Sequence, residues 1–301
     1  MKLYAPKYYE TFQCIAEKCK HNCCIGWEID IDDDTLENYH SLNCGYAKYI
    51  IDSIDYTDTP HFVLDNNKRC PHLNCENLCQ IILNCGENYL CEICKEHPRF
   101  YHETNHGLEV GLGIACEEAC RIVLSSDDFD KIIVIGEVEG KEKRFQHSVL
   151  SQRRLVYKIL KDNSLDLTKK METIYGNYDI SIDDSCISPL MQSLEYLDPL
   201  HIDLFTSFSA VLSNQTKEYE DILTRLYGYL IYRHCSDAKD YFDFRNGLCL
   251  ASFCIRLMLL ISDISNVYSI ARILSEEIEY SKENTEKIRD YFTEHDNFIQ
   301  D

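Results

Sequence analysis

Hydrophobic residues recur at helical spacing along most of the second half of the chain. A stripe of apolar side chains three and four residues apart predicts an amphipathic helix. Four segments carry this pattern: 149–160, 219–231, 248–261 and 267–278. Turn-forming residues at Asp162-Asn163-Ser164 and at Ser188-Pro189 predict turns between helices. Residues 281–301 are polar, and we expect this last tract to fray.

The first part of the chain has shorter elements. Residues 61–70 and 132–138 favour strands, the first ending in an Asn-Asn turn, and residues 117–124 favour a helix. Residues 99–114 alternate on both sides of Asn105-His106-Gly107, which predicts a hairpin. The fold class is therefore α+β and mainly α. We expect a small cysteine-rich region with short hairpins, residues 1–125, to pack on an α-helical region, residues 126–301.

Cysteine is concentrated near the N-terminus. Thirteen of the 17 cysteines lie at or before Cys120. The first residues lack the apolar core of a signal peptide, 301 residues are enough to bury a core without disulfides, and an odd number of cysteines cannot all pair. These features favour metal binding over a disulfide scaffold and predict a cytoplasmic protein.

Charge and hydropathy exclude two classes of partner. The net charge is −21, and no basic face is evident that could neutralise phosphates, so we expect no nucleic acid. No run of 18 apolar residues occurs, so we expect no membrane span. The acidic balance suits a lysine-bearing partner or serves solubility alone. The C-terminal helices accordingly have two interpretations, substrate recognition and scaffolding.

The densest chemistry lies between residues 14 and 24, where four cysteines follow the pattern Cys-x4-Cys-x3-Cys-Cys. Adjacent cysteines rarely form a disulfide with each other because the geometry is strained. Thiolates select zinc, copper(I) or iron–sulfur clusters. The segment therefore predicts a metal–thiolate site.

Further cysteines follow in Cys70-Pro-His-Leu, Leu78-Cys79, Cys91-x2-Cys94 and Cys116-x3-Cys120. Each single cysteine has an alternative interpretation as a small buried hydrophobic residue. We favour that interpretation for Cys249 and Cys254, which lie in an apolar helical run. It stays open for a second set: Cys44, Cys75, Cys85 and Cys120.

These motifs, in this order, resemble those of the flagellin lysine-N-methylase family, which is related to a cysteine-cluster domain that chelates zinc or iron. The matching segments are Cys-x4-Cys-x3-Cys-Cys-x-Gly-Trp at 14–27, Cys70-Pro-x-Leu, Leu78-Cys79-x-Ile, Gly86-Glu-x-Tyr-Leu, Cys94-x2-His-Pro-Arg and Cys116-x-Glu-Ala-x-Arg. This chain has His97 where the family usually has tyrosine and Glu117 where it usually has proline. Cys91 and Cys120 are additional cysteines.

The resemblance implies methyl transfer from S-adenosylmethionine to lysine side chains of flagellin, associated with an iron–sulfur cluster of the 4Fe-4S type, with zinc as the alternative metal. Carried over motif by motif, it implies eight metal ligands: Cys14, Cys19, Cys23, Cys24, Cys70, Cys79, Cys94 and Cys116. Eight sulfurs exceed one four-thiolate site, so one or two metal centres remain open. Two other functions also remain open, a non-enzymatic chelating or structural-metal protein and a redox protein.

The sequence identifies no catalytic residue and no cofactor-binding residue. It has no Gly-x-Gly-x-x-Gly opening a βαβ unit, and residues 107–113 are glycine-rich but alternate like a strand. Arg99 could bind a carboxylate or form an ordinary salt bridge. Glu109 and Glu117 could orient a lysine, although solvated surface carboxylates are commoner. Trp27 could cover the site or belong to the core.

Overall fold

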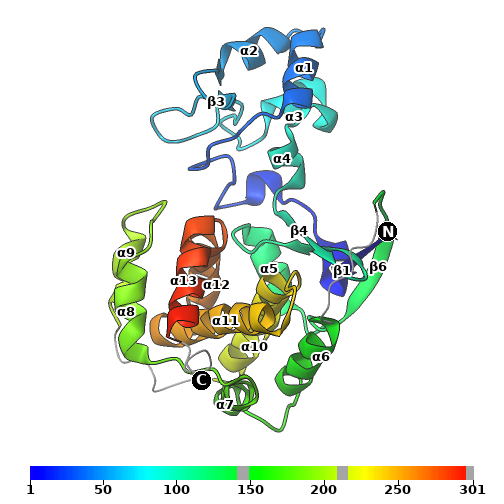
Figure 1. Ribbon diagram of the computed structural model, residues 1–301. Helices are drawn as coiled ribbons and strands as arrows, with labels where there is room; N and C mark the ends of the chain where they lie inside the picture. Colours follow the sequence, from blue (N-terminus) through cyan, green and yellow to red (C-terminus); the bar gives the residue numbers. More distant parts are fainter. Residues whose placement is uncertain (141–148, 209–215, 296–301) are drawn as a thin grey trace. The chain divides into compact units, whose positions relative to one another are not determined.

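The protein, seen here as a computed structural model, is described over residues 1–140, 149–208 and 216–295. It divides into two compact units (Figure 1). Unit 1 consists of Met1–Phe12, Tyr101–Ala115 and Ala119–Asp301. Unit 2 consists of Gln13–Phe100 and Cys116–Glu118. The units are thus not consecutive in sequence, because the N-terminal strand and the hairpin lie in a sheet of unit 1. The two are described separately below.

Unit 1 contains a mixed sheet whose strand order is β4-β5-β1-β6 in the described residues. Its strands are β1 (Lys2–Pro6), β4 (Arg99–Thr104), β5 (Gly107–Leu112) and β6 (Ile132–Glu137). β1 pairs in parallel with β5 and antiparallel with β6. The predicted hairpin and the strand at 132–138 are confirmed. β1 was not predicted, because a segment of only five residues that ends in a proline is too short to show a clear alternation of apolar and polar side chains.

The turn of the hairpin depends on a glycine. Gly107 has φ +148°, and a Cβ atom there would lie 2.4 Å from the backbone oxygen of Lys2. Only glycine therefore permits β5 to begin this close to β1. This explains why the glycine follows Asn105-His106 at the start of the second strand.

The rest of unit 1 is helical. Its helices, of which α5 begins in unit 2, are α5 (Glu117–Ser125), α6 (Val149–Leu160), α7 (Leu167–Tyr178), α8 (Asp184–Gln192), α9 (His201–Thr206), α10 (Lys217–Cys235), α11 (Tyr241–Ile261), α12 (Val267–Leu274) and α13 (Lys282–Glu294). A π-helical turn, Ser275–Glu279, follows α12. The helices predicted at 117–124, 149–160, 219–231, 248–261 and 267–278 are confirmed, the last continuing through the π-helical turn. A turn also lies at 162–164, as predicted.

Two predictions for this unit are wrong. Pro189 lies inside α8 instead of in a turn. The side chain of Asp183 caps this helix and its apolar face is buried, which outweighs the cost of about 3 kcal/mol for an internal proline. Residues 282–294 form α13 instead of fraying, because Ser281 caps the helix and Ile288 and Phe292 are buried. Residues 296–301 of the predicted frayed tract lie outside the described residues.

The core of unit 1 forms around α10 and α11, which pack against each other. Cys249 and Cys254 are buried in α11, as predicted. Within the described residues, α11 is the one helix long and apolar enough to cross a membrane by length and composition, but 72% of its most apolar window is buried inside the protein. This burial is what a core helix of a folded domain requires.

Replacing Gly247 with alanine should destabilise unit 1. A Cβ at Gly247 would lie 2.2 Å from the backbone oxygen of His234 on α10, so the two helices would have to separate. Overpacking of this kind costs about 1–3 kcal/mol. Thermal unfolding would measure it, with Gly176→Ala on α7 as the control, because nothing lies within 4 Å of a Cβ there. Equal stability of the two variants would contradict close packing at Gly247.

Unit 2 is built from short elements and long connections (Figure 1). They are α1 (Asp33–Ser41), α2 (Ala47–Asp52), α3 (Gln80–Cys85), α4 (Glu92–Glu96), the paired strands β2 (Ile54–Asp55) and β3 (His61–Phe62), and two 3-10 turns, Ala16–Lys18 and Glu87–Tyr89. The strand predicted at 61–70 is therefore only two residues long. It ends early because the carboxylate of Asp65 accepts the N–H groups of Asn67 and Arg69, which folds the predicted turn.

Candidate metal centre

All eight predicted ligands belong to unit 2. Backbone hydrogen bonds bring three of their segments side by side. The N–H of Cys70 donates to the oxygen of Cys24 over 2.8 Å, and the N–H of Gln80, next to Cys79, donates to the oxygen of His72 over 2.7 Å. The segments that carry Cys23-Cys24, Cys70 and Cys79 are thereby neighbours, although more than 40 residues separate the first two.

Helix α4 and its N-cap residue supply two further thiols, Cys94 and Cys91. The Sγ atoms of Cys91 and Cys94 lie 3.4 Å apart. The start of α4 is held in place by Asp32, the N-cap residue of α1, whose carboxylate accepts the N–H of Glu92 over 2.8 Å. One capping carboxylate therefore fixes the position of the helix that carries this pair.

The surroundings of these thiols are apolar. Cys70 and Cys91 belong to a buried cluster, and Cys24, Cys79 and Cys94 pack against it. The apolar members of that cluster include Ile29, Ile31, Tyr39, Ile50, Phe62 and Ile81. Unit 2 thus builds its core partly from sulfur, so its stability depends on how these thiols are satisfied.

Burial and mutual proximity shift the pKa values of these thiols. Burial, with smaller contributions from the charges of Cys79, Cys91 and Cys23, raises the pKa of Cys70 to about 12. A hydrogen bond between the side chains of Cys23 and Cys24 lowers the pKa of Cys23 and raises that of Cys24.

Six sulfurs from four segments shift one another's pKa values, and we call them the inner thiol group: Cys23, Cys24, Cys70, Cys79, Cys91 and Cys94. At its margins Cys23 also affects Cys19, and Cys79 also affects Cys85. Without a cation, a low-dielectric site of this kind keeps most of its thiols protonated.

The remaining predicted ligands are Cys14, Cys19 and Cys116. Burial, with smaller contributions from the charges of Glu117, Cys116 and Cys23, raises the pKa of Cys19 to about 12. The carboxylate of Glu117 accepts the N–H groups of Lys20 and His21 over 2.8 and 3.0 Å, which ties the Cys19 turn to the Cys116 segment. Glu117 was expected to be a surface carboxylate or to orient a lysine. In the structure its carboxylate holds the loop after Cys19 by these two hydrogen bonds. Cys14 is exposed.

These residues fit a thiolate-bound metal in donor type, and two pairs of them lie close together, Cys23 with Cys24 and Cys91 with Cys94. In the described part of the chain, however, no three His, Cys, Asp or Glu side chains are placed so that they could hold a metal ion as they stand. The Cys91 and Cys94 sulfurs are 3.4 Å apart, whereas two thiolates on a tetrahedral zinc are about 3.8 Å apart, from bonds of about 2.3 Å. Binding to one zinc ion would require the paired thiols to open slightly. Binding to an iron–sulfur cluster of the 4Fe-4S type would require them to move further apart, because each cysteine binds a different iron. The eight-ligand assignment therefore stays a prediction.

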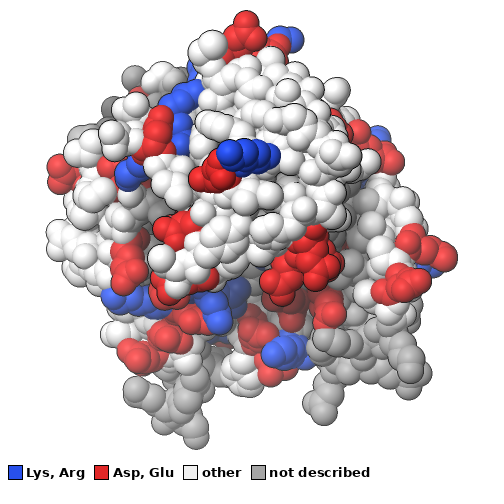
Figure 2. All heavy atoms as spheres, turned by 90° about the horizontal axis from the view of Figure 1, so that it is seen from above, with Lys and Arg blue, Asp and Glu red and all other residues white. Residues whose placement is uncertain are grey.

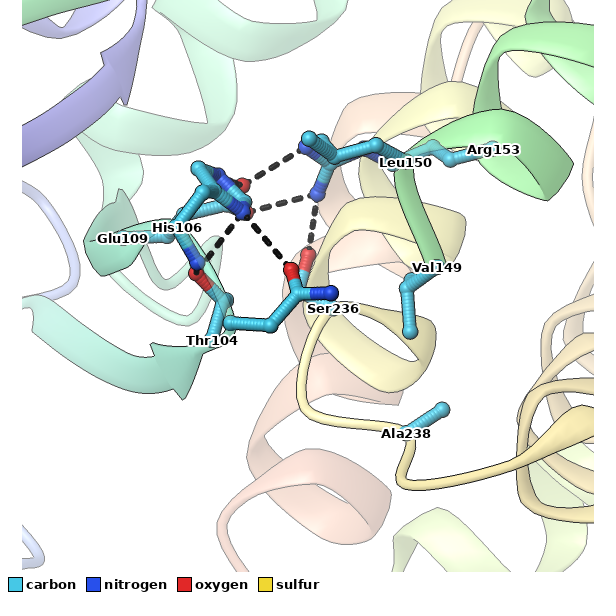
Figure 3. A pocket seen from close by; sticks show the side chains of 9 residues that line it. Thr104, His106, Glu109, Val149, Leu150, Arg153, Ser236 and Ala238 are labelled. Carbon is cyan, nitrogen blue, oxygen red and sulfur yellow. Dashed lines mark hydrogen bonds and ion pairs between the residues drawn. The ribbon is translucent and has the colours of Figure 1, made fainter. Parts of the chain in front are cut away.

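Glu109 lies elsewhere, in unit 1, and is not the solvated carboxylate that its residue type suggested. Its side chain is fully buried, and its carboxylate accepts two hydrogen bonds from Arg153, over 2.6 and 2.7 Å. The same carboxylate forms an ion-pair contact with His106 over 2.9 Å (Figure 3). Thr104 and Ser236 complete the pocket around them, which leaves no room for a water molecule. Because these groups satisfy one another, this pocket is a structural ion pair.

The other singled-out residues have local partners. The guanidinium of Arg99 donates to the backbone oxygen of Lys95 over 3.1 Å. Trp27 is half-buried. The glycine-rich segment 107–113 is mostly strand β5, as expected. Two side chains of the buried cluster around these thiols, Cys91 and Tyr39, were not among the predicted ligands. The Cys91-x2-Cys94 spacing was available as a signal for the first, and no sequence signal marked the second.

The surface reflects the acidic composition. On the face shown in Figure 2, acidic side chains are scattered among uncharged ones and outnumber the basic side chains.

Comparison with known proteins gives a limited set of relatives. No family model matches the chain, and no solved structure matches it. The flagellar biosynthetic protein FliU of Salmonella muenchen is 25% identical over 157 residues, which cover 48% of this chain and 86% of that protein. Lysine-N-methylases of Salmonella typhimurium and Salmonella choleraesuis are each 25% identical over 137 residues, which cover 41% of this chain. The match spans about a third, 32%, of the length of either methylase. Over less than half of its length, this chain is thus similar to a flagellar biosynthetic protein and to lysine-N-methylases.

Proposed function

We propose that the protein methylates lysine side chains of flagellin in the cytoplasm, with S-adenosylmethionine as the methyl donor and an iron–sulfur cluster held by the thiols of unit 2. The observation that carries the proposal is the similarity of this chain both to lysine-N-methylases and to a flagellar biosynthetic protein. The ordered cysteine motifs support the same reaction through their family resemblance.

The reaction sets a clear requirement on the substrate. The lysine nitrogen forms a bond to the methyl carbon while the bond from that carbon to the sulfonium sulfur breaks, which gives methyl-lysine, S-adenosylhomocysteine and a proton. Free lysine has a pKa of about 10.4, so the attacking amine must first lose its proton. A desolvating environment lowers that pKa. When bound, the metal centre would order the thiol-bearing segments and, as iron–sulfur, supply a redox-active group.

Transfer of labelled methyl groups tests the proposal. Protein purified without oxygen is incubated with methyl-labelled S-adenosylmethionine and flagellin co-purified from the same cells. We expect label on lysine residues of flagellin and none on a flagellin whose lysines are chemically acetylated beforehand. Absence of transfer by protein with full metal content would contradict the proposal.

One observation favours a second function. Cysteines form part of the apolar core of unit 2, where secondary structure is short, so a metal could serve only to staple this unit. Structural metal sites of this kind supply folding free energy outright. A structural-metal protein would hold its metal and transfer no methyl group. The same two measurements, metal content and methyl transfer, therefore separate the functions.

The acidic surface provides a prediction about substrate binding. Glu218, exposed in the first turn of α10, should attract a lysine-bearing partner, so Glu218→Lys should weaken flagellin binding most at low salt. Asp221 is less suitable because its carboxylate pairs with Lys217 over 2.9 Å. Binding would be measured at several salt concentrations, with Asp58→Lys, an exposed acid in unit 2, as the charge-matched control. Equal binding by both variants would assign α10 to scaffolding.

A further inference from the structure

Cys91 belongs to the inner thiol group and Tyr39 lies in the same buried cluster, but neither residue is part of the matched sequence motifs. We propose that Cys91 is a ligand of the metal centre together with Cys94, and that the Tyr39 hydroxyl donates a hydrogen bond to a sulfur of the same centre. This inference rests on the metal centre of the proposed function, and it names which side chains of this chain make it.

The position of Cys91 is that of a ligand. Its side chain is 1% exposed, and its sulfur lies 3.4 Å from that of Cys94. The N–H of Cys94 donates to the oxygen of Cys91 over 3.0 Å, so the Cys-x2-Cys segment folds into a single turn with both sulfurs on one side. Two thiols at this spacing recur in thiolate metal sites. The segment is also held from outside by the bond from the N–H of Glu92 to Asp32.

Tyr39 gives an independent indication that a hydrogen-bond acceptor belongs beside these thiols. It lies on α1, its side chain is fully buried, and its hydroxyl has no hydrogen-bond partner in the structure. Buried polar groups are almost always hydrogen-bonded, so an unpaired hydroxyl points to an unseen acceptor. Burial is the main cause that raises the pKa of Tyr39, and the next are the charges of Cys91, Cys94 and Cys79. The phenol therefore lies close to the inner thiol group, where a metal-bound sulfur would accept its hydrogen.

Including Cys91 as a ligand also affects how many metal centres the cysteines of unit 2 would form. With Cys91 included, the inner thiol group alone offers six sulfurs from four segments, enough for one four-thiolate centre without Cys14, Cys19 or Cys116. The three outlying cysteines are then available for a separate role. Loss of Cys91 should consequently affect the metal centre more than loss of Cys14.

Metal analysis of single variants tests the assignment. Iron, zinc and acid-labile sulfide are measured per chain in wild type, Cys91→Ser, Tyr39→Phe and the control Cys75→Ser, whose cysteine is exposed in the same unit. We expect Cys91→Ser to lose most of the metal and Cys75→Ser to keep it. Tyr39→Phe, which removes only the hydroxyl, should weaken metal affinity about tenfold, as loss of other outer hydrogen bonds does. For an iron–sulfur centre its reduction potential should also move to a more negative value.

A second measurement on wild-type protein removes any dependence on how the variants fold. Cysteine alkylation followed by mass spectrometry is compared before and after metal loading, at a mild denaturant concentration that exposes buried thiols. Metal should slow the alkylation of Cys91 as strongly as that of Cys94, and more than that of Cys85. Equal rates for Cys91 with and without metal, or wild-type affinity in Tyr39→Phe, would overturn the inference. A wild type that binds neither iron nor zinc would instead refute the metal centre itself.

Discussion

Replacing Cys23 and Cys24 together with serine should abolish metal binding and unfold unit 2. Binding of a structural metal contributes about 10–16 kcal/mol in zinc sites. That exceeds the whole stability of many domains, about 5–15 kcal/mol. The two cysteines are adjacent and hydrogen-bonded to each other, and Cys24 is in the electrostatic reach of Cys70 and Cys79, so their loss removes two of the six sulfurs of the inner thiol group. Hydroxyls do not replace thiolates for zinc or iron–sulfur.

Two measurements follow this variant. Metal analysis should show little iron or zinc, and hydrogen exchange should show faster exchange in residues 13–100 than in α10 and α11. Cys75→Ser, which alters an exposed cysteine of the same unit, should behave like wild type. Full metal content in the double variant would contradict the central role of Cys23 and Cys24.

The second large effect concerns the buried ion pair of unit 1. Removing one partner of such a pair leaves the other charge uncompensated and costs about 3–5 kcal/mol. Glu109→Gln should therefore destabilise unit 1 by this amount, since Arg153 would remain buried with its charge (Figure 3). Thermal or denaturant unfolding measures the loss. Asp127→Asn breaks a pair with Arg225 in which the acid is 80% exposed, and it should cost about 0–1 kcal/mol.

The same pair predicts a pH dependence. Burial by itself raises the pKa of Glu109, but the charge and hydrogen bonds of Arg153, helped by His106, outweigh it and hold the pKa well below the usual 4.5. A carboxyl whose pKa is lower in the folded than in the unfolded chain stabilises the fold above the unfolded value and loses that contribution at lower pH. The stability difference between wild type and Glu109→Gln should thus be constant above about pH 4.5 and shrink below it. A difference that grows on acidification would contradict this ion pair.

Helices and the hairpin were readable from the sequence because their signals are local. The stripes of 149–160, 219–231 and 248–261 follow one helical face each, and Asn105-His106-Gly107 is a short turn between alternating segments. The structure adds only their bounds. Alternation was less reliable at 61–70, where one aspartate at 65 bends the chain after two strand residues.

Other features depended on contacts between distant residues. The strand β1 exists because two strands more than 100 residues away supply its hydrogen bonds. Helix α8 tolerates Pro189, and α13 is ordered, because each buries an apolar face that the unit provides. Glu109 reads as a surface acid in the sequence and becomes a buried partner only because α6 places Arg153 beside it.

The sequence by itself determined the helical character of the second half, the hairpin, and the concentration of cysteines at or before Cys120, since periodicity, turn residues and cysteine spacing are properties of short segments. Only the tertiary structure decided which thiols meet, that Cys91 and Tyr39 join them, and that Cys14 stays exposed. The physical reason is that thiols from distant segments meet only when loops of tens of residues fold back on themselves. The burial and the hydrogen bonds that hold such loops cannot be read from a local sequence pattern.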